Sequence, residues 1–396
     1  MTAGPLVHGM GTELVEPDWR PLTDDEVKDV LSHYVWPANL AGAGRADEAQ
    51  AAITWHSPRP MSAAALVRLG ATTVFVKRHS RRVRTTAQLA TEHEFGRYLK
   101  ARGLKVPTVL QTETGETALV AGEWVYELQE AVRGVDLYRD AMSWTPYTSL
   151  SHAHSAGVAL ARFHRSAAGF GRPARRTAVL MTSCQVVSSP EALRQVRQMM
   201  AERPGLARYL DRRPWENDLT QYHLPAIGRA APLLRRLAPQ WGHGDWHPSN
   251  LTWTSARPDA EVAAVFDLGL ANRTFAIHDL ATALERSTVS WLDLVGTGRA
   301  EADLDQVAAF VDGYQATRPL SDQEWAVLPE LLPVVHLEYA LSEIEYFADV
   351  VYSAPNADLS YETYLLGHTR WFESPNGSEL LDFLRAKARS WRRDGL

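Results

Sequence analysis

Hydrophobic residues at helical spacing open the chain, and short apolar runs follow them. Residues 23–26 (Thr-Asp-Asp-Glu) form a capping-box pattern, after which apolar side chains recur every three or four positions, at Val27, Val30, Leu31 and Tyr34. This pattern predicts a short amphipathic helix. The apolar and β-branched runs 63–69 and 72–77 flank Gly70 and Ala71, which predicts a hairpin whose second strand ends at Lys77.

A long helix and two further strands are predicted next. The spacing over 85–102 is helical, and Gly103 is typical of the residue that ends a helix. Alternation over 117–120 and 124–129 predicts two more strands. The first 130 residues are therefore expected to form a small sheet with one prominent helix.

The pattern changes to helical spacing after Gly134. Helices are predicted at 151–164, 191–210 and 224–237, and again from Leu280 to the end of the chain. Short β-like runs at 250–253 and 262–266 interrupt them. We therefore predict an α+β fold with two lobes: an antiparallel-sheet lobe over 1–130 and a larger, mainly helical lobe over 131–396.

The composition excludes several classes of protein. The 396 residues carry a formal net charge of -6, which provides no general attraction to nucleic acid or to an anionic membrane. No apolar run approaches the roughly 20 residues that span a bilayer, and the N-terminus lacks the pattern of a secretory signal. The single cysteine, Cys184, has no partner for an internal disulfide. We expect a cytoplasmic protein that binds neither nucleic acid nor a membrane.

The segment between the predicted helices carries two motifs whose spacing along the sequence is characteristic. Residues 243–250, His-Gly-Asp-Trp-His-Pro-Ser-Asn, match the H-x-D-x-x-x-x-N catalytic loop of kinases. Seventeen residues after Asn250, an apolar run ends in Asp267-Leu268-Gly269, which corresponds to the metal-binding D-F-G of kinases. Together the motifs predict a phosphoryl-transfer site that uses ATP and Mg²⁺.

Each residue type in these motifs suits one requirement of the reaction. A carboxylate must orient the acceptor hydroxyl and accept its proton, and we assign this catalytic role to Asp245. Magnesium prefers hard oxygen ligands that link it to the phosphates, and Asn250 and Asp267 provide them. The alternative is structural, with the two aspartates as turn residues and the asparagine as a cap.

An upstream cation and acid complete the predicted phosphate site. Lys77 closes an apolar strand, and the following helix carries Glu92 and Glu94. Kinases use a Lys-to-Glu ion pair to hold the α- and β-phosphates. We favour Glu92 as the partner of Lys77, because Glu94 would lie about 200° further round the helix.

With these residues in place, the chain resembles the aminoglycoside phosphotransferase and choline kinase-like superfamily, the small-molecule branch of the protein-kinase fold. The resemblance covers most of the chain and also rests on the segments 74–77, 124–131, 160–164 and 266–280. It implies a two-lobed protein-kinase-like fold whose hinge, formed by Gln129, Glu130 and Ala131, holds the adenine. It further implies that Asp279 supports the catalytic loop.

One segment departs from the kinase pattern. Where kinases close a glycine-rich loop over the phosphates, residues 55–62 (Trp-His-Ser-Pro-Arg-Pro-Met-Ser) contain two prolines and no glycine. Contact with the phosphates then falls to Ser57, Ser62 or Arg59. A catalytically silent, nucleotide-binding pseudokinase is the alternative that this loop raises.

The acceptor is predicted to be a small molecule bearing a hydroxyl. Asp279 follows Asp267 by only twelve residues and no A-P-E follows, so a protein kinase's activation segment has no room. Acidic and aromatic side chains on the C-terminal helices suit sugars by stacking and amines by charge. The candidates are Glu285, Trp291, Glu338, Glu343 and Tyr346. Each equally fits a helix core or a solvated face.

The sequence therefore leaves several acceptors open. An aminoglycoside or other antibiotic, an amino sugar, a sugar and an amino alcohol are all compatible with these side chains, as are a resistance role and a metabolic role. The oligomeric state is also open.

Overall fold

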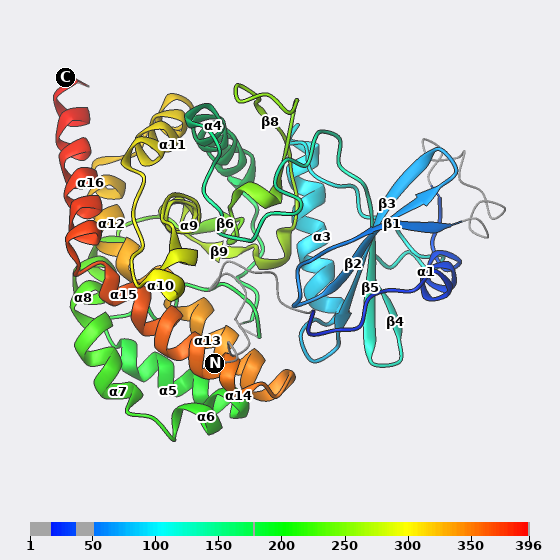
Figure 1. Cartoon of the computed structure of the whole chain (residues 1–396), viewed down its shortest axis with the longest axis horizontal. Helices are drawn as coiled ribbons and strands as arrows, with labels where there is room; N and C mark the ends of the chain where they lie inside the picture. The colour runs from blue at the N-terminus through cyan, green and yellow to red at the C-terminus, as the bar shows by residue number, and fades with distance from the viewer. Residues whose placement is uncertain (1–16, 37–50, 177–178, 395–396) are drawn as a thin grey trace.

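A computed structural model describes residues 17–36, 51–176 and 179–394, which form a sheet lobe and a helical lobe side by side (Figure 1). Residues 1–16, where a secretory signal would begin, lie outside the described part. The two-lobed α+β architecture predicted from the sequence is confirmed. The division of the chain at residue 130 stays a prediction. No helix of the described segments is long and apolar enough to cross a membrane.

The sheet lobe is built on five antiparallel strands in the order β1-β2-β3-β5-β4. Their bounds are β1 (Ala52–His56), β2 (Ala63–Leu69), β3 (Thr72–Ser80), β4 (Leu119–Ala121) and β5 (Trp124–Glu130). Strand β3 runs three residues beyond the predicted end at Lys77, because Arg78, His79 and Ser80 continue the pairing with β5. All three are buried although they are polar. The pattern of apolar and polar residues therefore did not predict this part of the strand. The half-buried edge strand β1 was not predicted.

Two helices flank this sheet. In α1 (Asp24–Leu31) the Thr23 side chain accepts from the Glu26 backbone N–H at 3.2 Å, which confirms the predicted cap. Helix α3 (Thr86–Ala101) lies between the sheet and the helical lobe (Figure 1). Phe95 of α3 packs edge-on against Phe163 of the helical lobe with ring centroids 5.8 Å apart. Helix α3 thereby joins the two lobes.

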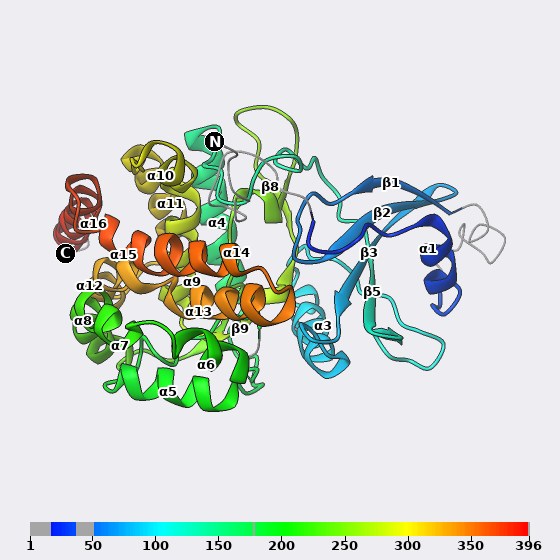
Figure 2. The same cartoon turned by 60° about the horizontal axis from the view of Figure 1, so that its bottom comes forward.

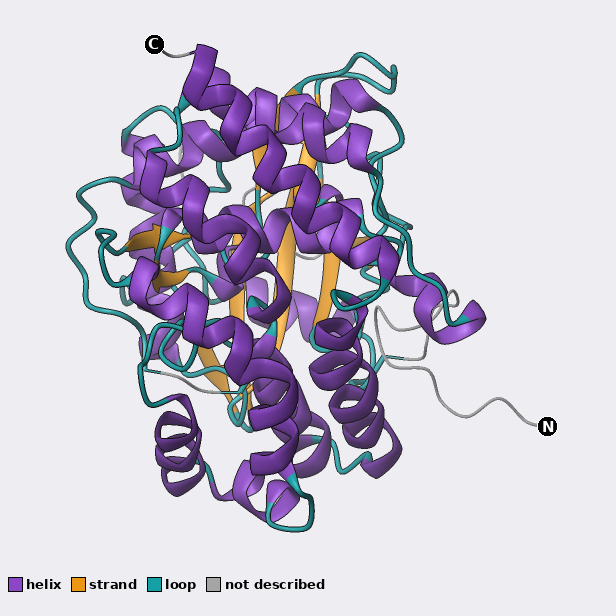
Figure 3. Ribbon diagram, turned by 90° about the vertical axis from the view of Figure 1, so that its left-hand side faces the viewer, coloured by secondary structure: helices purple, strands orange, loops and turns teal. Residues whose placement is uncertain are grey.

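The helical lobe contains a tightly packed pair of helices, α4 (Leu150–Ala167) and α11 (Leu304–Thr317), which lies at its upper edge in Figure 1. Side chains at Gly157 of α4 or Gly313 of α11 would collide with the backbone of the other helix, so glycine allows this close approach. Figure 2 and Figure 3 show, from two further sides, the helical lobe with its other helices. They are α5 (Ala192–Glu202), α6 (Pro204–Leu210), α7 (Trp215–Asp218), α8 (Leu224–Leu234), α9 (Ala276–Thr288), α10 (Trp291–Thr297), α12 (Asp322–Leu331), α13 (Leu337–Glu345), α14 (Ala354–Leu359), α15 (His368–Trp371) and α16 (Pro375–Asp394).

Two small hairpin-like sheets bring the motif residues together. Strand β6 (Gln240–Gly242) pairs with β9 (Asn272–Thr274), and β7 (Leu251–Trp253) pairs with β8 (Val262–Val265). The loop 243–250 connects β6 to β7, and Asp267 follows β8. Helix α9 then begins at Ala276, four residues before the predicted start. Every residue of α9 is buried.

Candidate active site

The loop 243–250 is fixed by one buried carboxylate. Asp279, in the first turn of α9, accepts hydrogen bonds from the backbone N–H groups of His243 and Gly244, both at 2.7 Å. Gly244 has φ of +77°, and a side chain there would collide with the carbonyl of Leu270, so glycine is needed at this turn. Asp279 thus lies where the family resemblance placed it.

Two buried side chains hold Asp279 in turn. His164 of α4 donates from Nε2 to Asp279 at 3.0 Å, and its Nδ1 bonds to the Tyr314 hydroxyl of α11 at 2.7 Å. Burial acts to raise the pKa of Asp279, but these bonds and the nearby histidines lower it overall. The α4–α11 pair therefore supports an ionised carboxylate, which orders the loop before any ligand binds.

Asp245 projects from this loop with its side chain 20% exposed. Its carboxylate accepts hydrogen bonds from Arg286 of α9 and, at 3.2 Å, from Asn250 Nδ2. His247 Nε2 lies 3.5 Å from it. Burial and the charge of Arg59 lower the pKa of His247 to about 3, so this ring is neutral at pH 7. The carboxylate is held in place and remains accessible.

Lys77 of the sheet lobe and Asp267 of the helical lobe form an ion pair between the two lobes. Lys77 Nζ lies 3.1 Å from both oxygens of Asp267. Asp267 has φ of +55°, a region that residues other than glycine seldom occupy and that is common at functional sites. Burial acts to raise the pKa of Asp267, but the charge and hydrogen bonds of Lys77 lower it overall. The carboxylate is therefore ionised at neutral pH.

The predicted ion pair between Lys77 and Glu92 does not form, and this part of the prediction is corrected. Glu92 Oε2 lies 3.5 Å from Arg175 Nη2, and Arg175 Nη1 donates to the carbonyls of Gly269 and Ala271 at 3.0 Å each. The fold places Asp267 within ion-pair distance of Lys77 and places Arg175 within ion-pair distance of Glu92. Each of the two predicted partners therefore pairs with another residue. Glu92 therefore reaches the D-L-G turn only through Arg175.

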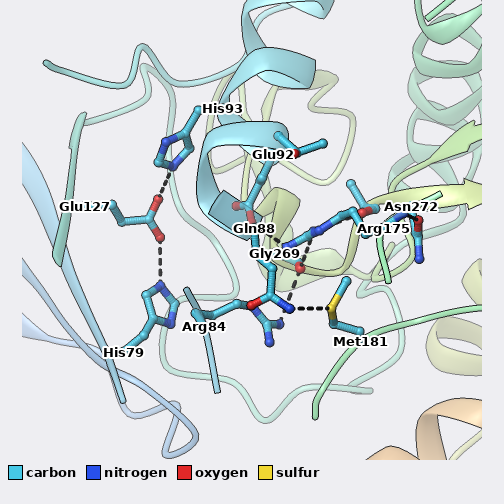
Figure 4. Close-up of polar contacts among 12 residues, drawn as sticks. His79, Arg84, Gln88, Glu92, His93, Glu127, Arg175, Met181, Gly269 and Asn272 are labelled. Carbon is cyan, nitrogen blue, oxygen red and sulfur yellow. Dashed lines mark hydrogen bonds and ion pairs between the residues drawn. The ribbon is translucent and has the colours of Figure 1, made fainter. Parts of the chain in front are cut away.

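A buried acid that the sequence analysis missed lies beside this network. Glu127 of β5 accepts from His79 Nε2 at 3.0 Å and from His93 Nε2 at 2.7 Å (Figure 4). Burial acts to raise the pKa of Glu127, but the two histidines hold it well below the usual range. The sequence did contain an indication of this buried acid, because Glu127 lies among apolar residues of a predicted strand.

Two clusters of potential metal ligands occur in the described segments, apart from the motif residues. One comprises Glu92, His93 and Glu127, and the other comprises Glu285, His336 and His368. Neither includes Asn250 or Asp267. Those two motif residues instead lie where the two cavities described next join.

Two cavities meet at the motif residues. The first, of about 290 Å³, is lined by Gln129, Glu130 and Ala131 and is named the hinge cavity. The second, of about 160 Å³, contains Asp245 and Ser62 in its lining and is named the Asp245 cavity. Four residues line both: Arg59, Lys77, Asn250 and Asp267. The site thus has two chambers that join where these four side chains lie.

Of the five acceptor candidates, the structure places only Glu343 in the lining of the Asp245 cavity. Glu285 bonds to His368 at 2.8 Å and Trp291 stacks on the same ring. Glu338 binds backbone N–H groups of 186 and 187, and Tyr346 donates to Asp18. These four are buried in the helical lobe, because acids and aromatics at helical spacing do not reveal which face borders a cavity.

The residues that do line the Asp245 cavity beside Glu343 include Trp144, Arg286 and Tyr339. The sequence analysis missed Arg286, although a signal was present. It follows Asp279 by seven residues, or two helical turns, and so projects from the same face of α9. Trp144 lies in an irregular segment and left no such signal.

Comparison with known proteins gives consistent results. Residues 62–320 match the model of the phosphotransferase enzyme family. An uncharacterized protein from Deinococcus radiodurans is 28% identical over 254 residues, which cover 63% of this chain and 64% of the relative. The match thus spans less than two thirds of that relative's length.

Three solved structures share the fold. An aminoglycoside phosphotransferase from Alicyclobacillus acidocaldarius is 17% identical with a TM-score of 0.52, over 94% of this chain and 98% of that one. A microcompartment-associated aminopropanol kinase is 16% identical with a TM-score of 0.51, over 88% and 97%. An amicoumacin kinase in complex with AMP-PNP and Ca²⁺ is 13% identical with a TM-score of 0.54, over 87% and 95%. At these identities the likeness shows the fold alone.

Proposed function

This chain belongs to the phosphotransferase enzyme family, and from that premise we propose that it transfers the γ-phosphoryl group of ATP to a hydroxyl of a small molecule. The observation that carries the proposal is the junction of the two cavities. Lys77, Asn250 and Asp267 line both, whereas Asp245 lines only the Asp245 cavity. A nucleotide in the hinge cavity would thus face an acceptor held beside the carboxylate.

The hinge cavity suits a nucleotide. It is lined by the hinge residues Gln129, Glu130 and Ala131, beside which the adenine would lie. The apolar side chain of Phe75, the cross-strand neighbour of Gln129, lines the same cavity. Lys77 would exchange Asp267 for the phosphates. Of the candidates in the glycine-free loop, Arg59 lines both cavities, Ser57 lines the hinge cavity and Ser62 lines the Asp245 cavity.

The motif residues also fit a divalent metal ion. Asn250 Nδ2 donates to the Asp245 backbone carbonyl at 2.8 Å, which leaves the amide oxygen for a ligand. The ionised Asp267 carboxylate is a second hard oxygen donor. Mg²⁺ bound there would neutralise charge on the transferring phosphoryl group. The complex of the amicoumacin kinase with AMP-PNP and Ca²⁺ supports the use of a nucleotide and a divalent metal.

Asp245 would orient the acceptor hydroxyl and accept its proton. Arg286 and Asn250 fix the carboxylate from two directions, so its orientation costs little at the moment of reaction. Glu92 would act at a distance, by holding Arg175 against the turn that carries Asp267. These roles follow from contacts of the chain's own residues.

Several properties remain part of the proposal. The names of the aminopropanol kinase and the aminoglycoside phosphotransferase support a small hydroxyl compound as the acceptor. A cytoplasmic location is a prediction from composition. The second candidate function is a silent nucleotide-binding pseudokinase, which the glycine-free loop 55–62 favours.

Replacing Asp267 with Ala tests the proposed function. We expect ADP release to fall by about 10⁴-fold, because metal-mediated charge stabilisation is worth several kcal/mol. Mg²⁺-dependent ATP binding should be lost as well. Asp259→Ala is the control, since that exposed residue pairs only with Arg257. Unchanged turnover in Asp267→Ala would contradict the proposal, and Mg²⁺-ATP binding by the native chain without phosphorylation of any acceptor would favour the pseudokinase.

A further inference from the structure

The charges that line the Asp245 cavity are unequal. Its acids are Asp245, Asp267 and Glu343, and its strong bases are Arg59, Lys77, Arg84 and Arg286. Asp267 is paired with Lys77 and Asp245 with Arg286. Within the described segments, Arg59 and Arg84 have no carboxylate within ion-pair distance, which leaves surplus positive charge in the wall.

Glu343 does not offset that surplus. Burial raises its pKa to about 8, and its carboxyl is bonded to the Ser360 hydroxyl at 3.1 Å. At pH 7 this side chain is therefore mainly neutral. A polycationic acceptor would find no free carboxylate in this chamber, because both ionised acids already have partners.

Arg286 is the cation best placed to bind part of the acceptor. Its guanidinium lies 4.9 Å from the Tyr339 ring centroid and is 3% exposed as a residue. A guanidinium offers five donors in a planar fork. Among the described residues, its side chain makes one hydrogen bond, to Asp245, and its buried Nε has no partner. Donors therefore remain for a second anion beside Asp245.

The size and walls of the Asp245 cavity limit the kind of acceptor molecule that can carry this anionic group. At about 160 Å³, the cavity has little more than half the volume of the neighbouring hinge cavity, which measures about 290 Å³. Trp144 and Tyr339 provide aromatic walls. A compact molecule fits these limits better than a multi-ring antibiotic.

We propose that the acceptor is a compact hydroxyl compound with an anionic group, a carboxylate or a phosphate, which Arg286 binds while Asp245 holds the hydroxyl a few bonds away. This inference rests on the proposed function and narrows its acceptor. It departs from the amine-bearing acceptors that the sequence left open alongside sugars, because the acids that suit an amine are buried elsewhere or neutral.

The test is an ADP-release assay of the full chain with Mg²⁺-ATP and matched acceptors. The panel contains hydroxy acids such as 4-hydroxybutyrate with their amides, glycerol phosphate with glycerol, and cationic compounds such as aminopropanol and kanamycin. We expect one anionic member to exceed its uncharged partner by about 10- to 100-fold in kcat/KM, since a charge-assisted hydrogen bond is worth about 1.5 to 3 kcal/mol. The acid and phosphate arms distinguish the two anions.

Variants at Arg286 then assign the preference. Arg286→Gln should bring the ratio between anion and uncharged partner close to one, mainly through a higher KM for the anion. Arg286→Lys, which keeps the charge and guards against a folding failure, should retain part of the ratio. Arg203→Gln is the matched control, because Arg203 forms a buried ion pair with Glu345 outside both cavities. It should leave the ratio unchanged.

The outcomes separate this inference from the proposed function. Equal or better use of the uncharged or cationic compounds overturns the anionic acceptor, as does failure to phosphorylate any anionic member while Mg²⁺-ATP still binds. An equal loss for both members of a pair in Arg286→Gln also overturns it, because Arg286 would then serve only to position Asp245. Absence of Mg²⁺-dependent nucleotide binding would instead remove the proposed function itself.

Discussion

The two sides of the cleft are organised by different kinds of interaction. On the helical side, the loop 243–250 is fixed by backbone N–H groups that donate to Asp279, which α4 and α11 support. On the sheet side, charged side chains choose among partners, so that Lys77 pairs with Asp267 and Glu92 with Arg175. The first arrangement exists without any ligand, whereas the proposed binding of phosphates by Lys77 would require the second to change.

This difference explains which substitutions should destabilise the fold and which should slow the reaction. A carboxylate that satisfies buried backbone donors contributes mainly to stability, because its loss leaves those donors without partners. A charge that exchanges partners contributes mainly to ligand binding. Four predictions test the contrast, followed by the measurement on Asp245.

The largest effect is expected from Asp279→Ala. This change leaves two backbone donors and His164 without an acceptor in a buried region, so the free energy of unfolding should fall by about 3 to 5 kcal/mol. Urea unfolding measures it, with Asp382→Ala as the control on the exposed surface. A loss below about 1 kcal/mol would show that the loop is fixed by other contacts.

The next effect is a contrast in pH dependence. The pKa of Glu343 in the helical lobe is raised to about 8, so its contribution to stability is full below pH 4.5 and is lost as the pH rises through 8. Glu127 in the sheet lobe has a lowered pKa, so its contribution is present above pH 4.5 and is lost as the pH falls.

Unfolding free energies between about pH 2 and 8 test these opposite signs. Glu343→Gln should remove a decline on the order of 3 kcal/mol between pH 5 and 8. Glu127→Gln should instead flatten the acid side of the profile. Parallel profiles for the native chain and both variants would mean that neither carboxyl titrates as described.

A smaller effect, on rate, is expected from Arg59→Gln. Arg59 lies in the lining of both cavities and has no ion pair among the described residues, so loss of its contact with the phosphates should lower kcat/KM for ATP about 10- to 100-fold. Melting temperature should stay near that of the native chain. Arg194→Gln is the matched control, because Arg194 is exposed and lines neither cavity. Equal losses in the two variants would contradict a special role for Arg59.

The smallest effect is expected from Glu92→Gln. Because Glu92 bonds to Arg175 and not to Lys77, its loss should lower turnover by less than about tenfold, a free-energy change below roughly 1.4 kcal/mol. Steady-state kinetics with saturating ATP measure it. A fall of two or more orders of magnitude would show that Lys77 moves to Glu92 in the working enzyme, as the sequence alone suggested.

The same contrast explains what could be predicted from the sequence. The catalytic loop depends on short-range spacing, and Asp245, Asn250 and Asp267 were therefore found together. The helix α3 and the hairpin β2-β3 follow from local patterns in the same way. These are features that neighbouring residues decide.

What the sequence analysis missed depends on partners far apart in the chain. Lys77 and Asp267 are separated by 190 positions, and their preference over Glu92 is set by three-dimensional distance. The sequence analysis proposed Glu285 as an acceptor residue because an acid suits an amine. Its neighbour Arg286 lines the Asp245 cavity instead, because adjacent residues of a helix point to different sides. Tertiary packing decides such cases, and a pattern along the chain does not contain it.

The central claim is that Asp245 acts on the acceptor hydroxyl, and Asp245→Asn tests it most directly. The substitution keeps the shape and the contact with Arg286 but removes the proton-accepting charge. We predict a melting temperature and an ATP affinity close to those of the native chain, with kcat lower by about 10² to 10⁴. A turnover per folded molecule equal to that of the native chain would contradict the claim.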